Sequence, residues 1–219
     1  MINVEKSQPA PECLALEKLK KDGDYGCKDV RLRLKHDFFN KCYICEEKAP
    51  SSIVIEHFIA HEGDLSLKFD WNNLFFACTH CNSIKHNTFN DILNCTDFSE
   101  IITECLEFHF TPFPEEKTAI IPIKSNPKIL RTAEFLTKIY NGKTTNQIIE
   151  ADNIRSKLRN EISHFLDAIE DYQHSLQGKY RLKIKQLLSP ESAFTAFKIW
   201  IIKSRADYMI QFGDLLPSF

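Results

Sequence analysis

Two pairs of cysteines carry the most specific chemical signal in the sequence. They read CYIC at residues 42–45 and CTHC at residues 78–81. A C-x2-C turn lets two thiolates converge on one ion, and two such turns complete a tetrahedral zinc site. A closed four-thiolate site leaves no position for water, so its ion has a structural role. The alternative is two unrelated buried or redox-active pairs, but the matched spacing favours structural zinc at Cys42, Cys45, Cys78 and Cys81.

A second signal lies between the two pairs, where residues 55–61 read IEHFIAH. The β-branched and aromatic residues of this run are typical of a buried strand. Two adjacent ionisable groups, Glu56 and His57, cost free energy there unless something pairs with them. A metal or a substrate is the usual compensation. Successive side chains of a strand point to opposite faces, so the two groups can contact different partners.

The elements that position these residues are indicated by caps and periodicity. Residues 1–40 predict a charged helical segment interrupted at Gly23–Gly26, and a Pro-punctuated, partly strand-like connection follows residue 95. Beyond it, Asn141–Gly142 predicts a helix C-terminus, and Thr144 with Gln147 predicts a capping box that opens a long helix reaching Gly178. A final helix is expected to start at Ser189–Pro190–Glu191, with Phe194, Phe197, Ile201 and Tyr208 on its buried side.

The run from residue 55 to residue 87, IEHFIAHEGDLSLKFDWNNLFFACTHCNSIKHN, resembles the HNH endonuclease family. The shared features are an acid–His pair on a strand, an Asn-Leu step before the second cysteine pair, and C-x2-C-N-x2-K opening a helix. By this resemblance Glu56 and His57 match the first motif element, Asn73 the central asparagine and Asn82 the third element. It implies a β-hairpin followed by a helix, with a catalytic divalent ion held between strand and helix.

The resemblance also gives each residue an expected role. His57 is the expected general base that activates water, since its unperturbed pKa is near ~6.5. Glu56 and Asn82 are expected oxygen ligands of Mg²⁺ or Mn²⁺, and Asn73 is expected to fix the loop and the His57 ring. His86, one helical turn after Asn82, is a further candidate ligand of the catalytic ion.

Two further residues are candidate substrate contacts. Lys85 is a candidate phosphate contact, and the alternative is a solvated lysine on the helix surface. His61 lies four residues beyond His57 in a loop, where functional residues are frequent. The remaining histidines are expected at the surface or in the core, and Cys13, Cys27, Cys95 and Cys105 are expected to be core residues.

A longer string, IEHF followed by D-W-x-N-L-F-x-A-C-x-x-C-N-x-x-K, is similar to a narrower branch of the family, the PtuB-type nucleases of the Septu antiphage systems. Some members of that branch accompany retrons. The resemblance implies a partner, an ABC/SMC-like ATPase of the PtuA type, and a nucleic acid substrate, DNA by default and tRNA or another RNA as the alternative. The C-terminal helices, which carry no chemistry of their own, are the expected docking surface.

Together these features predict an α+β protein, mostly α, with a zinc-supported ββα-metal nuclease core. The expected organisation is a helical lead-in at residues 1–40, a zinc-stabilised HNH core at 41–94 and a helical region for partner docking at 95–219. Two other classes of function stay open: a non-catalytic zinc module that binds nucleic acid or protein, and a toxin-like interaction protein restrained by its partner.

Composition limits the classes of function. The chain has 219 residues, 43% of them hydrophobic, and a net charge of −2. A free-standing nucleic-acid binder usually has a basic excess, which occurs here only between Lys179 and Arg205. We find neither a secretory signal nor a run of roughly 20 apolar residues that would span a membrane. We therefore expect a cytoplasmic protein without membrane contact, in which eight cysteines favour metal binding.

Overall fold

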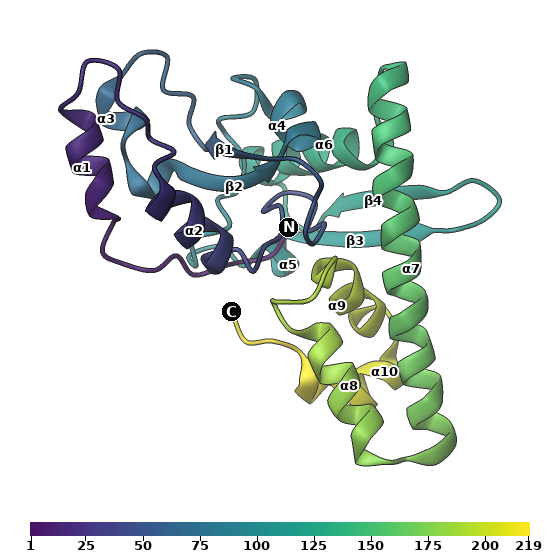
Figure 1. Ribbon diagram of the computed structural model, residues 1–219. Helices are drawn as coiled ribbons and strands as arrows, with labels where there is room; N and C mark the ends of the chain where they lie inside the picture. The colour runs from purple at the N-terminus through teal and green to yellow at the C-terminus, as the bar shows by residue number, and fades with distance from the viewer.

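The computed structural model describes residues 1–219 and has an α+β fold with mostly helices and two small antiparallel sheets (Figure 1). The first sheet pairs β1 (Ile53–His57) with β2 (Leu74–Cys78), and α4 (Thr79–Lys85) follows directly. The register places Cys78 opposite Ile53 and Leu74 opposite His57. This β-hairpin followed by a helix is the ββα arrangement that the sequence predicts. The short helices α3 (Leu65–Lys68) and η1 (Trp71–Asn73) lie in the connection between the strands.

The N-terminal region contains two short helices, α1 (Glu12–Lys18) and α2 (Lys28–Asp37). As predicted, the segment with Gly23 and Gly26 separates them. Cys13 and Cys27 form a disulfide between α1 and the start of α2, and both are only partly buried, so the prediction that these two cysteines are core residues is wrong. Their separation of 14 residues has no recognisable spacing pattern, and their proximity depends on how α1 folds back on α2.

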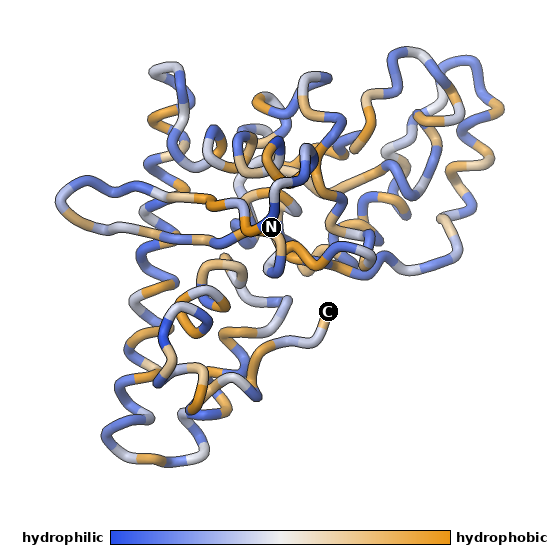
Figure 2. The backbone as a smooth tube through the Cα atoms, turned by 180° about the vertical axis from the view of Figure 1, so that it is seen from behind, coloured by the Kyte–Doolittle hydropathy of each residue, from blue (hydrophilic) through white to orange (hydrophobic).

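The second half of the chain begins with a short helix, α5 (Ile102–Cys105), and a second hairpin of β3 (Leu106–Thr111) and β4 (Lys117–Pro122). Two helices follow, α6 (Pro127–Asn141) and α7 (Thr145–Ser175). Gly142 ends α6 with a positive φ of 69°, and Thr144 with Gln147 forms the capping box of α7, so both predicted caps are confirmed. Alternating hydrophobic and hydrophilic residues along α7 are visible in Figure 2.

The C-terminal helices are α8 (Gly178–Leu188), α9 (Thr195–Lys203) and α10 (Ala206–Phe212), followed by η2 (Gly213–Leu215). They pack beside the lower part of α7, away from the first hairpin (Figure 1). The predicted helix start at Ser189–Pro190–Glu191 is wrong. Phe194 has a positive φ of 50°, and its N–H donates to the Glu46 carbonyl at 3.3 Å, so this contact with the first cysteine turn delays the helix until Thr195.

One hydrophobic core connects these regions. A single cluster of 51 buried residues runs from Met1 to Phe212 and includes the four cysteines of the predicted zinc site. Cys95 and Cys105 are also buried and unpaired, as expected for core residues. On α7, Leu158, Phe165 and Ile169 are buried, whereas Leu166 is 41% exposed. None of the helices combines the length and the apolar character that crossing a membrane requires.

Candidate active site and metal centre

The four cysteines of the two C-x2-C turns converge at one point. Their sulfur atoms all lie within 4.8 Å of one another, and the Sγ atoms of Cys45 and Cys78 are 3.9 Å apart. Four sulfurs at ~2.3 Å from a central zinc ion would be about 3.8 Å apart, so the spacing fits a tetrahedral zinc centre. All four side chains are buried, and burial raises the pKa of the Cys81 thiol. A bound cation is therefore needed to keep four thiolates together.

The zinc centre is connected to both halves of the protein by hydrogen bonds. In the first cysteine turn, the Tyr43 N–H donates to the Phe76 carbonyl of β2 at 2.9 Å. The hydroxyl of Tyr140, on α6, donates to the Cys45 carbonyl at 2.9 Å. His80, in the second turn, contacts the Ile139 carbonyl through Nε2 at 2.9 Å and the Glu150 carboxylate through Nδ1. These contacts hold in place β2, which pairs with the strand that carries Glu56 and His57, and α4, which carries Asn82.

His57 ends β1 with its ring in a defined orientation. Its Nε2 lies 3.0 Å from the Lys68 carbonyl, which accepts hydrogen bonds and cannot donate them, so the proton of the neutral ring is on Nε2 and the lone pair is on Nδ1. Burial lowers the pKa of His57, which favours the neutral ring at pH 7. The rings of Tyr25 and His61 lie against it, with centroids 4.6 Å and 4.7 Å from the imidazole centroid.

Glu56 points to the opposite face of the hairpin from His57, toward α4. Its Oε1 pairs with the Lys85 ammonium at 2.9 Å, and the same ammonium donates to the His57 carbonyl at 3.1 Å. Burial raises the pKa of Glu56, and the charge of Lys85 opposes that shift. The other oxygen, Oε2, makes no hydrogen bond and is not sealed from solvent. Glu56 therefore has one oxygen available for a cation.

Lys85 is neither a phosphate contact nor a solvated lysine, the two alternatives that the sequence suggested. Its side chain is completely buried under the hairpin instead of exposed on the surface of α4. The ammonium forms an ion pair with Glu56 and donates a hydrogen bond to the His57 carbonyl, and it lies 5.8 Å from the centre of the Phe58 ring. In this arrangement Lys85 cannot contact a substrate phosphate. Its contacts instead fix the backbone at the end of β1.

The remaining candidate ligands come from α4. Asn82 lies on α4, half-buried and with no hydrogen bond to its side-chain amide. His86 is the C-cap of α4, with a φ of 42°, and is close enough to Glu56 that its positive charge would lower the pKa of that carboxyl. His86 Nδ1 contacts the Asn87 side chain at 2.6 Å. His86 therefore lies near Glu56, and Asn82 lies one helical turn before Lys85, the residue that pairs with Glu56.

Asn73 is buried and uses its whole amide to hold the loop after β1. Its Oδ1 accepts from the Ile59 N–H at 2.7 Å, and its Nδ2 donates to the carbonyls of Ile59 and Leu67 at 2.9 and 3.1 Å. These bonds close the loop that runs from His57 to Lys68. Because Lys68 supplies the carbonyl that orients His57, Asn73 acts on the imidazole through the backbone and not by direct contact.

Three residues at the site were not identified from the sequence. Tyr25 comes from the loop between α1 and α2, Lys68 from the end of α3, and Asn90 accepts a hydrogen bond from the Ala60 N–H at 3.1 Å. Lys68 acts through a backbone carbonyl, which every residue type possesses, so no sequence pattern reveals it. Tyr25 lies in the connection between α1 and α2 that the Cys13–Cys27 disulfide closes, and it contacts His57 from outside the hairpin and α4.

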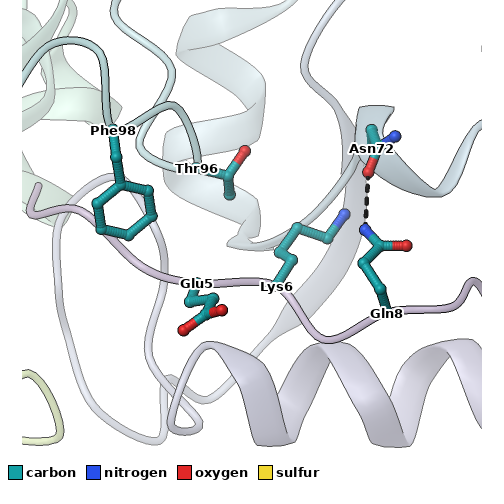
Figure 3. A pocket seen from close by; sticks show the side chains of 6 residues that line it. All are labelled: Glu5, Lys6, Gln8, Asn72, Thr96 and Phe98. Carbon is teal, nitrogen blue, oxygen red and sulfur yellow. Dashed lines mark hydrogen bonds between the residues drawn. The ribbon is translucent and has the colours of Figure 1, made fainter.

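A separate polar hollow of about 400 Å³ lies beside η1 and is shown in Figure 3. Gln8 donates to Asn72 across it at 3.1 Å. Lys6 lines the hollow, but its ammonium donates to the carbonyls of Trp71 and Leu74. Burial lowers the pKa of Lys6 to about 8. None of the candidate catalytic residues lines this hollow, so we do not assign it to the active site.

Comparisons with known proteins identify the class of the core. Residues 42–88 match the family model described as HNH endonuclease. The match begins at the first zinc cysteine and includes β1, β2 and α4, so the chain contains an HNH endonuclease domain at these residues. The fold and the cysteine cluster agree with a zinc-binding ββα-metal core. Comparisons with curated proteins and with solved structures gave no match.

Proposed function

We propose that the protein is a metal-dependent endonuclease that hydrolyses phosphodiester bonds of nucleic acid. The observation that carries this proposal is the orientation of His57 inside a domain that matches the HNH family. Its Nε2–H is committed to the Lys68 carbonyl, which leaves the Nδ1 lone pair free to accept a proton. The adjacent Glu56 retains an oxygen with no protein partner.

In this proposal each residue of the site has a separate chemical role. His57 Nδ1 accepts a proton from water, and the Lys68 carbonyl stabilises the imidazolium through the proton on Nε2. Glu56 Oε2 and the Asn82 amide oxygen are the ligands proposed for Mg²⁺ or Mn²⁺, with His86 as an additional ligand. A bound divalent cation would stabilise negative charge on the phosphate and on the leaving oxygen. Asn73 keeps the loop closed so that the imidazole does not rotate away.

The test compares His57→Ala with His174→Ala on DNA and on total tRNA, with and without Mg²⁺. His174 lies in the last turn of α7, remote in sequence from the HNH domain, and is a matched control. We expect His57→Ala to keep its zinc and its helical content and to lose at least 100-fold in cleavage rate, the scale of general-base catalysis. Unchanged cleavage by a folded His57→Ala protein would refute the assignment.

One observation favours a second candidate, a non-catalytic zinc module that binds nucleic acid or protein. Lys85 already pairs with Glu56, and a buried ammonium next to a proposed ligand opposes binding of a divalent cation there. Calorimetric titration with Mn²⁺ separates the two candidates. The nuclease proposal expects binding that Glu56→Gln weakens at least tenfold, whereas the module expects no difference between the variant and the wild type.

DNA is the default substrate in our proposal, with tRNA or another RNA as the alternative, because phosphate chemistry does not read the base. The similarity to PtuB-type nucleases supports a role in antiphage defence beside an ABC/SMC-like ATPase, and such a complex would act in the cytoplasm. The net charge of −2 is compatible with a partner that supplies part of the affinity for nucleic acid.

Within the basic residues 179–205, the charges that have no acidic partner support a docking site on α8. Arg181 pairs with Asp214, Arg205 pairs with Asp207, and Lys198 is buried against Glu161. The exposed lysines of this region are on α8, at residues 179, 183 and 185. We propose that these lysines of α8 contact the ATPase or nucleic acid. If the double variant Lys183→Glu, Lys185→Glu binds both the ATPase and nucleic acid normally, the proposed docking site is refuted.

A further inference from the structure

We propose that Tyr25 is a positioning residue for the His57 imidazole and that its position depends on the Cys13–Cys27 disulfide. The inference rests on the proposed function of His57 as the general base. It assigns a role to the loop between α1 and α2, which lies outside residues 42–88 of the HNH match. We call residues 19–27 the Tyr25 loop.

The rings around His57 restrict its rotation. Tyr25 and His57 meet edge to face, with an interplanar angle of 68°, and His61 meets the imidazole at 63°. Edge-to-face pairs of this kind are favourable arrangements of aromatic rings. The hydrogen bond to Lys68 fixes one ring nitrogen, while the two neighbouring rings limit rotation about the remaining side-chain torsion. Without Tyr25 the imidazole could turn and leave Nδ1 misdirected.

The Tyr25 loop is well organised internally. The Gly26 N–H donates to the Asp24 carboxylate at 2.7 Å, and Arg31 Nε donates to the Gly26 carbonyl at 2.6 Å. Gly23 lies so close to α1 that a Cβ atom there would be 1.9 Å from the Glu17 carbonyl oxygen, so the close approach requires glycine. The loop therefore has one shape, provided that α1 stays where it is.

Apart from the disulfide, α1 makes few contacts with the rest of the protein. α1 has only seven residues and buries only Leu14, whereas Leu16 is 63% and Leu19 is 85% exposed. The Tyr25 loop is bonded to the segment that carries Lys68 by a 3.3 Å hydrogen bond, which Lys68 Nζ donates to the Gly23 carbonyl. Without the disulfide, α1 and the Tyr25 loop depend on these few contacts, and we expect them to detach while the core remains folded.

The redox step is a thiol–disulfide exchange. A dithiol reductant breaks the bond between the sulfurs of Cys13 and Cys27, each sulfur gains a hydrogen, and the reductant leaves as its own cyclic disulfide. In a reducing cytoplasm the pair would be two thiols and the Tyr25 loop would be loose. Exchange with a disulfide oxidant, which takes up the two hydrogens and leaves as two thiols, would re-form the Cys13–Cys27 bond, fix Tyr25 on His57 and increase activity.

The test uses the full chain with its zinc content measured throughout. The probe is dithiothreitol, and two properties are recorded: the NMR signal of the His57 ring Cε1–H, assigned with His57→Gln, and kcat for DNA cleavage. We expect the reductant to move the His57 signal to its position in Tyr25→Ala and to lower kcat about threefold to tenfold, the scale of an aromatic pair. Tyr25→Phe keeps the ring, so its His57 signal and its kcat should equal those of the oxidised wild type.

The double variant Cys13→Ser, Cys27→Ser is the control for effects of dithiothreitol on the zinc cysteines. It should resemble the reduced wild type and should not respond to the reductant. An unchanged His57 signal on reduction, or a Tyr25→Ala protein with normal kcat and a normal pH profile, would overturn the proposal. If no variant cleaves nucleic acid but the His57 signal still moves, the nuclease assignment fails and the redox-dependent contact stands.

Discussion

Replacement of Asn73 tests whether the loop after β1 positions the His57 imidazole. Asn73→Ala removes the three hydrogen bonds of a buried side chain and leaves the Ile59 N–H and the carbonyls of Ile59 and Leu67 without partners. At about 1 kcal/mol per bond, the expected loss of stability is about 3 kcal/mol. For a chain of this length that corresponds to a fall in melting temperature of roughly 6–12 °C. Asn73→Asp keeps the acceptor but turns a carboxylate oxygen toward two carbonyls, so it should cost at least as much.

The assay is urea denaturation of both variants, followed by Mg²⁺-dependent cleavage below their melting temperatures. The neighbouring Asn72 is the matched control, because its exposed side chain contacts only Gln8 at the surface. Asn72→Ala should change stability by less than about 0.5 kcal/mol. If Asn73 were instead a ligand of the catalytic ion, Asp would be the better ligand, and Asn73→Asp would retain activity. Normal stability and cleavage in Asn73→Asp would refute the positioning role.

Three other predictions follow from the buried charges and thiols. Cys81→Ser should lose zinc, measured by atomic absorption, and should unfold at a lower urea concentration than Cys105→Ser, which changes a buried cysteine outside the cluster. Lys85→Met should destabilise the chain by about 3 kcal/mol in urea denaturation, because it leaves the Glu56 carboxylate buried without its partner, and an unchanged midpoint would contradict this. Burial lowers the pKa of Lys198 to about 8 in the folded state, so the unfolded chain binds more protons above that pH and stability should rise from pH 8 to pH 9. Lys198→Met should lose about 1 kcal/mol of that rise, and equal slopes for variant and wild type would disprove the shift.

The sequence predicts the local features of this fold well because short spacings determine them. The two C-x2-C turns and the capping box at Thr144 each depend on residues within one turn of chain, and the structure shows both. The start of α9 was predicted wrongly because Phe194 is held by Glu46, a contact between distant segments. The same reason explains the Cys13–Cys27 disulfide, which depends on how two short helices meet.

The residues of the candidate site also separate into those that a local sequence pattern reveals and those that depend on contacts between distant segments. The acid–His pair of β1 and the asparagine before β2 are visible in the sequence because their order along the chain is fixed by a hairpin of short strands. The burial of Lys85 was not predictable, since a lysine at that position of α4 is compatible with either face until the helix is packed against the hairpin. Tyr25 comes from outside the hairpin and helix, so the local pattern contains no information about it.

The register of the first hairpin explains why a structural zinc ion matters for an imidazole that does not bind it. Cys78 is paired with Ile53 at one end of the ladder, and Leu74 is paired with His57 at the other end. An isolated two-stranded hairpin is marginally stable in water, so its geometry must be imposed from outside. The candidate zinc centre at the four cysteines is at the Cys78 end, and the hydrogen bonds of Asn73 and Lys68 fix the loop at the His57 end. Loss of either constraint would let β1 shift relative to α4, and would therefore move the imidazole relative to the candidate ligands on α4.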